Sequence, residues 1–136
     1  CAPMNTMPEI AKAQGCKWDP LVNVWLSKEA FEESENLSTV EKFLSQGPWH
    51  HYLHQNGSGT VKPEYERLLG AWLMKREHLI HCQLTLRQSY FWMSKGYGTT
   101  HFFKHTVHCL RFLLDTIFEN PPKDLDDIQA FITPFP

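Results

Sequence analysis

Two copies of one five-residue pattern hold the side chains of this chain that are best suited to bind a metal ion. The first copy is His78-Leu79-Ile80-His81-Cys82, and the second is His105-Thr106-Val107-His108-Cys109. Residues three and four positions apart lie on one face of an α-helix, so each copy would point two imidazoles and one thiol the same way. Imidazole and thiolate are ligands that zinc and copper prefer. The repeat therefore predicts a shared metal site formed by His78, His81, His105 and His108.

A simpler interpretation is that these are core histidines on two amphipathic helices. One HxxHC motif alone would favour it, but two copies in 136 residues favour the metal site. Three further histidines are candidate ligands. His50 and His54 would share a face if residues 49–54 were helical, and His101 precedes His105 by one helical turn. Each has a competing interpretation as a polar surface residue.

The motifs are expected on two neighbouring helices. Apolar residues at helical spacing predict one helix from about residue 63 to 93 and another from about residue 101 to 118. Gly96 and Gly98 interrupt them with a short connection, which predicts antiparallel packing. The wetter side of the first helix is expected to carry Lys75, Arg76, Glu77, Arg87 and Gln88.

The rest of the chain predicts shorter elements. Residues 1–20 read as an irregular arm, which a disulfide between Cys1 and Cys16 could hold in place. Ser27 is a candidate N-cap of a short helix, and a second helix is expected to start near residues 38–39 and to stop at Gly47-Pro48. Residues 124–131 could add one short turn. Since no stretch alternates strongly, we predict a mostly α, small helical domain with the core helix pair over residues 63–118.

Composition limits the partners and the compartment. A formal net charge of −2 gives no electrostatic reason to expect a nucleic acid or an anionic membrane surface as a partner. Asn36 and Asn56 begin glycosylation sequons, which fit a secretory-pathway protein. No apolar run is long enough to span a bilayer, so an anchor would lie upstream of this chain. Four cysteines allow three complete disulfide pairings, or thiolate ligands, at Cys1, Cys16, Cys82 and Cys109.

The paired motif resembles that of the UstYa-like family of fungal oxidases, in which each HxxHC opens a helix of the form HC-x-x-x-L-R. The first copy matches, because Cys82 is followed by Leu86 and Arg87. The second departs, because Cys109 is followed by Leu113 and then by Leu114 in place of the arginine. Many relatives also have another cysteine where residues 117–119 read Ile-Phe-Glu. The resemblance covers about the last half of the chain.

This resemblance implies a copper-dependent oxidase that modifies C–H bonds of peptides or other secondary metabolites, by macrocyclisation, hydroxylation, dehydrogenation or halogenation. Residues 1–136 would then be one catalytic domain in the secretory-pathway lumen, anchored by an N-terminal membrane helix absent from this chain. A homologous chain could act as a partner in a homo- or heterodimer. Residue by residue, the resemblance carries over only to His78, His81, Cys82, His105, His108 and Cys109.

The chemistry separates three hypotheses. Copper on several imidazoles can activate dioxygen, whereas zinc has no redox chemistry, and the histidines suffice for one or two copper ions. Cys82 and Cys109 would be first-shell thiolates or, as an oxidising lumen favours, disulfide-bonded scaffolding. The main alternative is a non-enzymatic interaction domain held by a closed structural zinc site. The third hypothesis is a disulfide-stapled binding protein whose histidines only pack.

Overall fold

The structure is a computed structural model that describes residues 1–62, 64–66, 70–97 and 100–123. In that part of the chain, five helices make up about half of the protein, so a mostly helical fold is confirmed at this coarse level. Two small antiparallel sheets, which the sequence analysis did not predict, accompany them. The elements are α1 (Pro8–Ala13), β1 (Lys17–Asp19), β2 (Val24–Leu26), α2 (Lys28–Phe31), α3 (Ser34–Ser45), β3 (His51–Tyr52), β4 (Thr60–Val61), α4 (Lys75–Ser94) and α5 (Thr100–Glu119).

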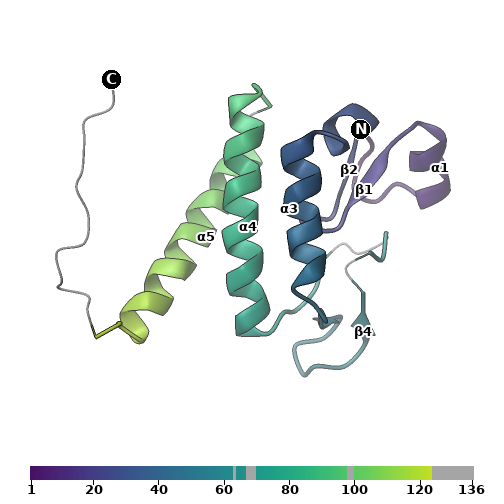
Figure 1. Ribbon diagram of the computed structural model, residues 1–136. Helices are drawn as coiled ribbons and strands as arrows, with labels where there is room; N and C mark the ends of the chain where they lie inside the picture. The colour runs from purple at the N-terminus through teal and green to yellow at the C-terminus, as the bar shows by residue number, and fades with distance from the viewer. Residues whose placement is uncertain (63, 67–69, 98–99, 124–136) are drawn as a thin grey trace, which may run out of the picture.

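Helix α4 is the central helix, because it packs against α3 on one side and α5 on the other (Figure 1). α4 and α5 run in opposite directions, since the start of α4 meets the end of α5: Lys75 Nζ lies 2.8 Å from Glu119 Oε2. One buried apolar cluster fixes α4 against α3 and the flanking segments, and it contains Leu21, Phe43, Trp49 and Leu84.

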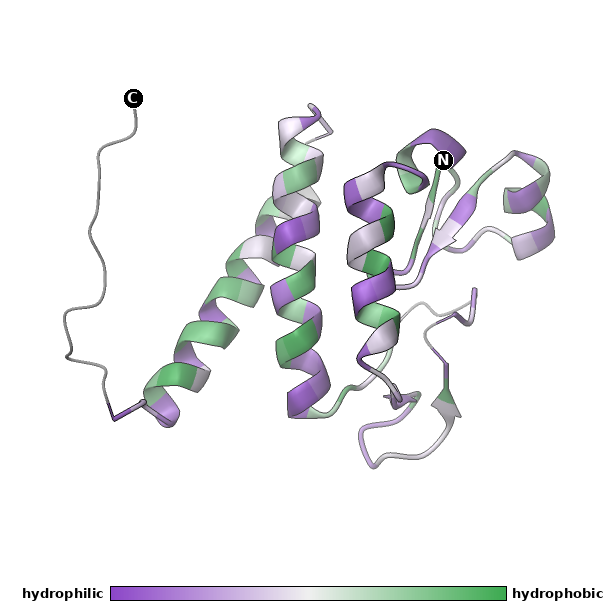
Figure 2. Ribbon diagram, in the orientation of Figure 1, coloured by the Kyte–Doolittle hydropathy of each residue, from purple (hydrophilic) through white to green (hydrophobic). Residues whose placement is uncertain are grey.

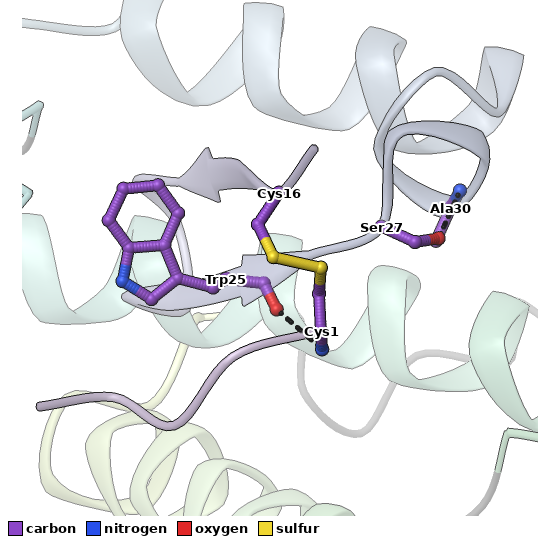
Figure 3. The surroundings of a disulfide bond; sticks show 5 residues. All are labelled: Cys1, Cys16, Trp25, Ser27 and Ala30. Atoms are coloured by element: carbon purple, nitrogen blue, oxygen red, sulfur yellow. Dashed lines mark hydrogen bonds between the residues drawn. A yellow bond between two sulfur atoms is a disulfide. The ribbon is translucent and has the colours of Figure 1, made fainter. Parts of the chain in front are cut away.

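The N-terminal segment is ordered, so the predicted irregular arm over residues 1–20 is wrong. β1 and β2 form an antiparallel hairpin in which Trp18 lies opposite Trp25. Cys1 and Cys16 are joined by a disulfide, and the main-chain nitrogen of Cys1 donates to the carbonyl oxygen of Trp25 at 3.1 Å (Figure 3). The order comes from contacts between residues distant in sequence, which local composition does not encode. The suggested Cys1–Cys16 pairing is the one found.

The two helices that follow were predicted with unequal success. Ser27 is the N-cap of α2, as predicted, and its Oγ accepts a hydrogen bond at 3.2 Å from the backbone N–H three residues later. α3 begins at Ser34, earlier than the predicted start near residues 38–39. Asn36 lies inside the first turn of the helix, where its buried side-chain amide donates a hydrogen bond to the carbonyl oxygen of Phe31 at 3.2 Å.

Helix α4 begins at Lys75, so the predicted helical start near residue 63 is wrong. Upstream of α4 the chain is extended, because Trp72 exchanges two backbone hydrogen bonds with Tyr52, at 2.9 and 2.8 Å. In the first turn of α4, Glu77 Oε2 accepts from the backbone N–H of the N-cap residue at 3.4 Å. A strand contact from outside the helix, together with this cap, therefore sets its boundary.

A buried polar network joins α4 to α3 and to the first hairpin. Gln88 Nε2 donates to Asp19 Oδ2 at 2.7 Å and to Asn36 Oδ1 at 2.8 Å, and Asp19 Oδ1 accepts from the backbone N–H of Leu21 at 2.9 Å. All three polar side chains are buried. The prediction that Glu77 and Gln88 lie on the wetter side of their helix is therefore wrong, because both are buried through polar contacts with distant segments.

The asparagines of the two glycosylation sequons differ in their exposure to solvent, and this difference predicts which of them carries a glycan. Asn36 has no exposed surface and its amide is hydrogen-bonded on both sides, whereas Asn56 lies in an exposed turn. We expect protein secreted from a eukaryotic host to carry a glycan at Asn56 and none at Asn36. Intact mass before and after enzymatic deglycosylation, compared with Asn56→Gln, measures this. A glycan on Asn36 in folded protein would contradict the buried network.

Helix α5 contains many hydrophobic residues along its length (Figure 2). Phe103, Leu110, Leu114 and Phe118 are each more than half exposed, and their spacing places them on one face of the helix. An apolar face of this kind is typical of a surface that contacts another molecule. Within the described residues, no helix combines the length and the apolar character that crossing a bilayer requires.

Candidate metal site

The two HxxHC motifs lie where α4 and α5 pack together. Across the helix pair, the ring centroids of His78 and His108 are 5.5 Å apart, and those of His81 and His105 are 5.6 Å apart. Along each helix the neighbouring rings are separated by 6.4 and 6.5 Å. We call these four residues the histidine cluster. The structure thus brings together all four of the ligands predicted from the repeat.

The distances between the four imidazole rings are close to those expected around one metal ion, but the rings are not oriented as metal ligands would be. Metal–nitrogen bonds of about 2 Å in tetrahedral geometry place imidazole centroids about 5 Å apart. In the cluster, however, His78 and His108 face each other as stacked rings, and His78 also stacks on Phe112 at 4.0 Å. Accordingly, in the described part of the chain no three His, Cys, Asp or Glu side chains converge as a metal ion requires. Metal binding would require rotation of these rings.

Burial and mutual repulsion favour the neutral form of the two α4 rings of the cluster, His78 and His81. Desolvation, followed by the charges of His105 and His78, lowers the pKa of His81 to about 3. Desolvation also lowers the pKa of His78, and the charge of His108 adds to the effect. A neutral imidazole has a free nitrogen lone pair, which is the form that binds a metal. At neutral pH, His78 and His81 are therefore in the protonation state that a metal site needs, whereas the hydrogen bond with Cys109 raises the pKa of His105.

The two cysteines of the motifs are buried thiols that are not joined to each other. Cys109 Sγ lies 3.7 Å from His105 Nε2. A hydrogen bond from the Cys82 thiol lowers the pKa of Cys109 to about 5, while the same contact raises the pKa of Cys82. As the pH rises, Cys109 is thus the first of the two thiols to lose its proton, and its sulfur lies next to the imidazole of His105. The expectation that Cys82 and Cys109 are disulfide-bonded scaffolding is therefore wrong: the disulfide joins Cys1 to Cys16, and the two motif cysteines are free thiols, a type of side chain that can act as a soft metal donor.

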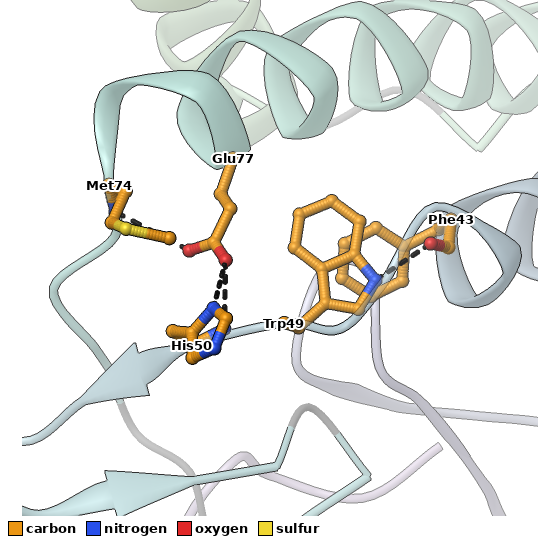
Figure 4. A network of polar contacts seen from close by, with 5 residues as sticks. All are labelled: Phe43, Trp49, His50, Met74 and Glu77. Carbon is orange, nitrogen blue, oxygen red and sulfur yellow. Dashed lines mark hydrogen bonds and ion pairs between the residues drawn. The ribbon is translucent and has the colours of Figure 1, made fainter.

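The stretch around residues 49–54 is extended and not helical, which changes the ligand assignment. Because side chains alternate along a strand, His50 and His51 face opposite ways. His50 points to the start of α4, where its Nδ1 lies 3.0 Å from Glu77 Oε1 and its backbone N–H donates to the same oxygen at 2.9 Å (Figure 4). His54 is exposed in the following turn. The predicted face shared by His50 and His54 does not exist.

His51 is the residue of this stretch that the sequence analysis did not select. It is 4% exposed, and its ring stacks 6.4 Å from that of Trp49. The signal that could have identified it is the alternation Trp49, His51 against His50, Tyr52, which is the pattern of a strand with one buried face. The side chain of His101 and the expected turn at residues 124–131 lie outside the described part of the chain.

A cavity of about 700 Å³ lies in the N-terminal half of the molecule, away from the cluster. Its walls include Trp18, Trp25 and Phe31, with Lys12 and Lys17 at its polar side. No histidine is among the residues that line it in the described part of the chain. Size and aromatic walls suit a ligand pocket, but the groups able to do redox chemistry lie at the helix pair. The cluster, and not this cavity, is therefore the candidate site for such chemistry.

Fold and site together define a small helical protein with imidazoles and thiols gathered between two antiparallel helices. Comparison of the chain with known protein families, with curated proteins and with solved structures finds no match.

Proposed function

We propose that this chain is a copper-dependent oxidative tailoring enzyme of the UstYa-like type. It would act on C–H bonds of a peptide or other secondary metabolite, with dioxygen as oxidant. The observation that carries the proposal is the pairing of imidazoles across α4 and α5, His78 with His108 and His81 with His105. The secretory-pathway lumen is the proposed compartment, because Cys1 and Cys16 are disulfide-bonded and such bonds persist in oxidising compartments.

The donor set fits copper. Neutral imidazoles suit copper in both oxidation states, and the thiolate of Cys109 suits Cu(I). His78, His81, His105 and His108 would hold one or two copper ions, which when bound would supply one-electron chemistry with dioxygen. The protein's part is to keep the imidazoles of His78 and His81 unprotonated by burial and to place the Cys109 sulfur beside His105. The buried helix contact also excludes bulk water from one side of the cluster.

A structural zinc domain remains the second candidate, because of the thiols. Cys82 and Cys109 are both fully buried within the same helix contact, and closed sites of cysteine and histidine are typical of structural zinc. Such a site would fill all coordination positions with protein ligands. The two candidates therefore differ in which metal is retained, and that difference can be measured.

The test is metal loading of protein made in a secretory host with copper supplementation. We expect elemental analysis to give one or two copper ions per chain, and His81→Ala or His108→Ala to lose most of that copper while circular dichroism reports the wild-type helical content. His54→Ala, in an exposed turn, is the matched control and should load as the wild type does. Stoichiometric zinc that resists exchange by copper would favour the structural candidate. Full copper loading in both cluster variants would refute the site.

A further inference from the structure

The cavity of about 700 Å³ in the N-terminal half has walls that the chain itself holds in place. Trp18, Trp25 and Phe31 line it, together with Cys16, and we call it the aromatic cavity. Trp18 and Trp25 lie opposite each other in the β1–β2 hairpin, and their rings meet edge to face with centroids 5.2 Å apart. The disulfide from Cys16 to Cys1 ties the chain at the start of this hairpin (Figure 3). The walls are thus formed before any ligand binds, as is usual for small-molecule sites.

The aromatic cavity is apolar in its depth and charged at its rim. Trp25 is 2% exposed and Trp18 is 8% exposed, and Val40, another lining residue, is also buried. Phe31 of α2 adds a third ring to the lining. The lysines of the lining are exposed, so their ammonium groups lie where the cavity meets solvent. This arrangement suits a ligand with an apolar body and one charged end.

The charges at the rim favour an anion. Three lysines and two glutamates line the cavity, so positive charge is in excess: they are Lys12, Lys17, Lys28, Glu64 and Glu66. Lys12 is neutralised by Glu66, because its Nζ lies 2.6 Å from Oε2. Within the part of the chain that the structure describes, no carboxylate lies within ion-pair distance of Lys17 or Lys28. Two ammonium groups, against the single charge of Glu64, are therefore available to pair with a carboxylate that a ligand brings.

We propose that the aromatic cavity is a second ligand site, which binds a small molecule with an aromatic body and one carboxylate. The aromatic body packs against Trp18, Trp25 and Phe31, since edge-to-face and offset contacts between rings are favourable. The carboxylate lies at the rim, beside Lys17 and Lys28. A volume of about 700 Å³ is within the usual range for sites of this kind. The aromatic cavity shares no residue with the histidine cluster, so this inference goes beyond the proposed function and does not depend on a metal.

The test measures the binding of 2-naphthoate and of its uncharged counterpart 2-naphthamide to the full chain by isothermal titration calorimetry. We expect one molecule of 2-naphthoate per chain, bound at least about threefold more tightly than the amide, because an ion pair at an exposed rim contributes modestly. Lys17→Gln and Lys28→Gln should each reduce this preference, and the double variant should abolish it. Lys42→Gln is the matched control, because Lys42 is exposed and does not line the cavity, and it should keep the wild-type preference.

A change in the aromatic wall tests whether the probe lies inside the cavity. Phe31→Ala should weaken the binding of both probes by about tenfold, because it removes a ring from the wall. Phe31→Leu keeps apolar bulk, so it serves for the comparison if circular dichroism shows that the alanine variant is unfolded. Unchanged affinity in the folded Phe31 variant would place the probe elsewhere and overturn the proposal.

The remaining outcomes also decide the matter. Absence of saturable binding of 2-naphthoate up to about 1 mM would overturn the proposal, as would equal affinity for the two probes or a preference that survives in the double lysine variant. His81→Ala should bind 2-naphthoate as the wild type does, because the histidine cluster takes no part in this site. Failure of copper loading and failure of this proposal are therefore independent results.

Discussion

Replacing Gln88 with leucine should lower the free energy of unfolding by about 3 kcal/mol or more at neutral pH. The Gln88 amide donates to both Asp19 and Asn36, and all three side chains are buried. Leucine has a similar size but no donor, so the substitution leaves a buried carboxylate and a buried amide oxygen short of a partner. Urea unfolding followed by circular dichroism measures the loss.

Gln83→Leu is the matched control, because Gln83 lies on the same helix and is exposed. It should change the stability by no more than about 0.5 kcal/mol. A loss below about 1 kcal/mol in Gln88→Leu would mean that the network is not what ties α4 to α3 and to the first hairpin. Since α4 carries the first HxxHC motif, we also expect Gln88→Leu to weaken metal binding through misplacement of the helix, with no change in the ligands themselves.

What the sequence predicted well is what depends on neighbouring residues. Ser27 is an N-cap because its own side chain bonds the backbone three residues later. The HxxHC repeat places two imidazoles on one helical face because helix geometry alone requires it. Likewise, the helices predicted over about residues 63–93 and 101–118 overlap α4 and α5, although α4 begins only at Lys75. These features need no knowledge of distant contacts.

What it did not predict depends on contacts between distant segments. The start of α4 is set by Trp72 pairing with Tyr52, and a helical pattern upstream of it could not reveal that pairing. Gln88 and Glu77 are polar residues that composition assigns to the surface, yet each is buried by a partner many residues away. His51 was missed for the related reason that two residues of strand are too short to show their alternation clearly.

Acidification should destabilise the metal-free protein, and His81 should account for a large share of the effect. The pKa of His81 is about 3 in the folded protein because of desolvation and of the neighbouring His105, His78, His51 and His108. In the unfolded chain it returns to about 6.5. Above pH 6.5 the ring is neutral in both states and contributes no pH dependence. As the pH falls below that value, the unfolded chain binds a proton that the folded protein does not, so stability decreases.

His81→Gln should therefore reduce the pH dependence of stability by up to one proton. Between about pH 6.5 and pH 4, that proton corresponds to as much as about 3 kcal/mol, which the variant would not lose. Urea unfolding in the presence of a chelator, repeated across this range, measures the slope, with His54→Gln expected to keep the wild-type slope. Asp19 acts in the opposite sense, because burial raises its pKa and its stabilising contribution is lost as the pH rises. Since Asp19 is present in both proteins, the difference between their slopes isolates His81, and equal slopes would mean that its ring is protonated as freely in the folded protein as in the unfolded chain.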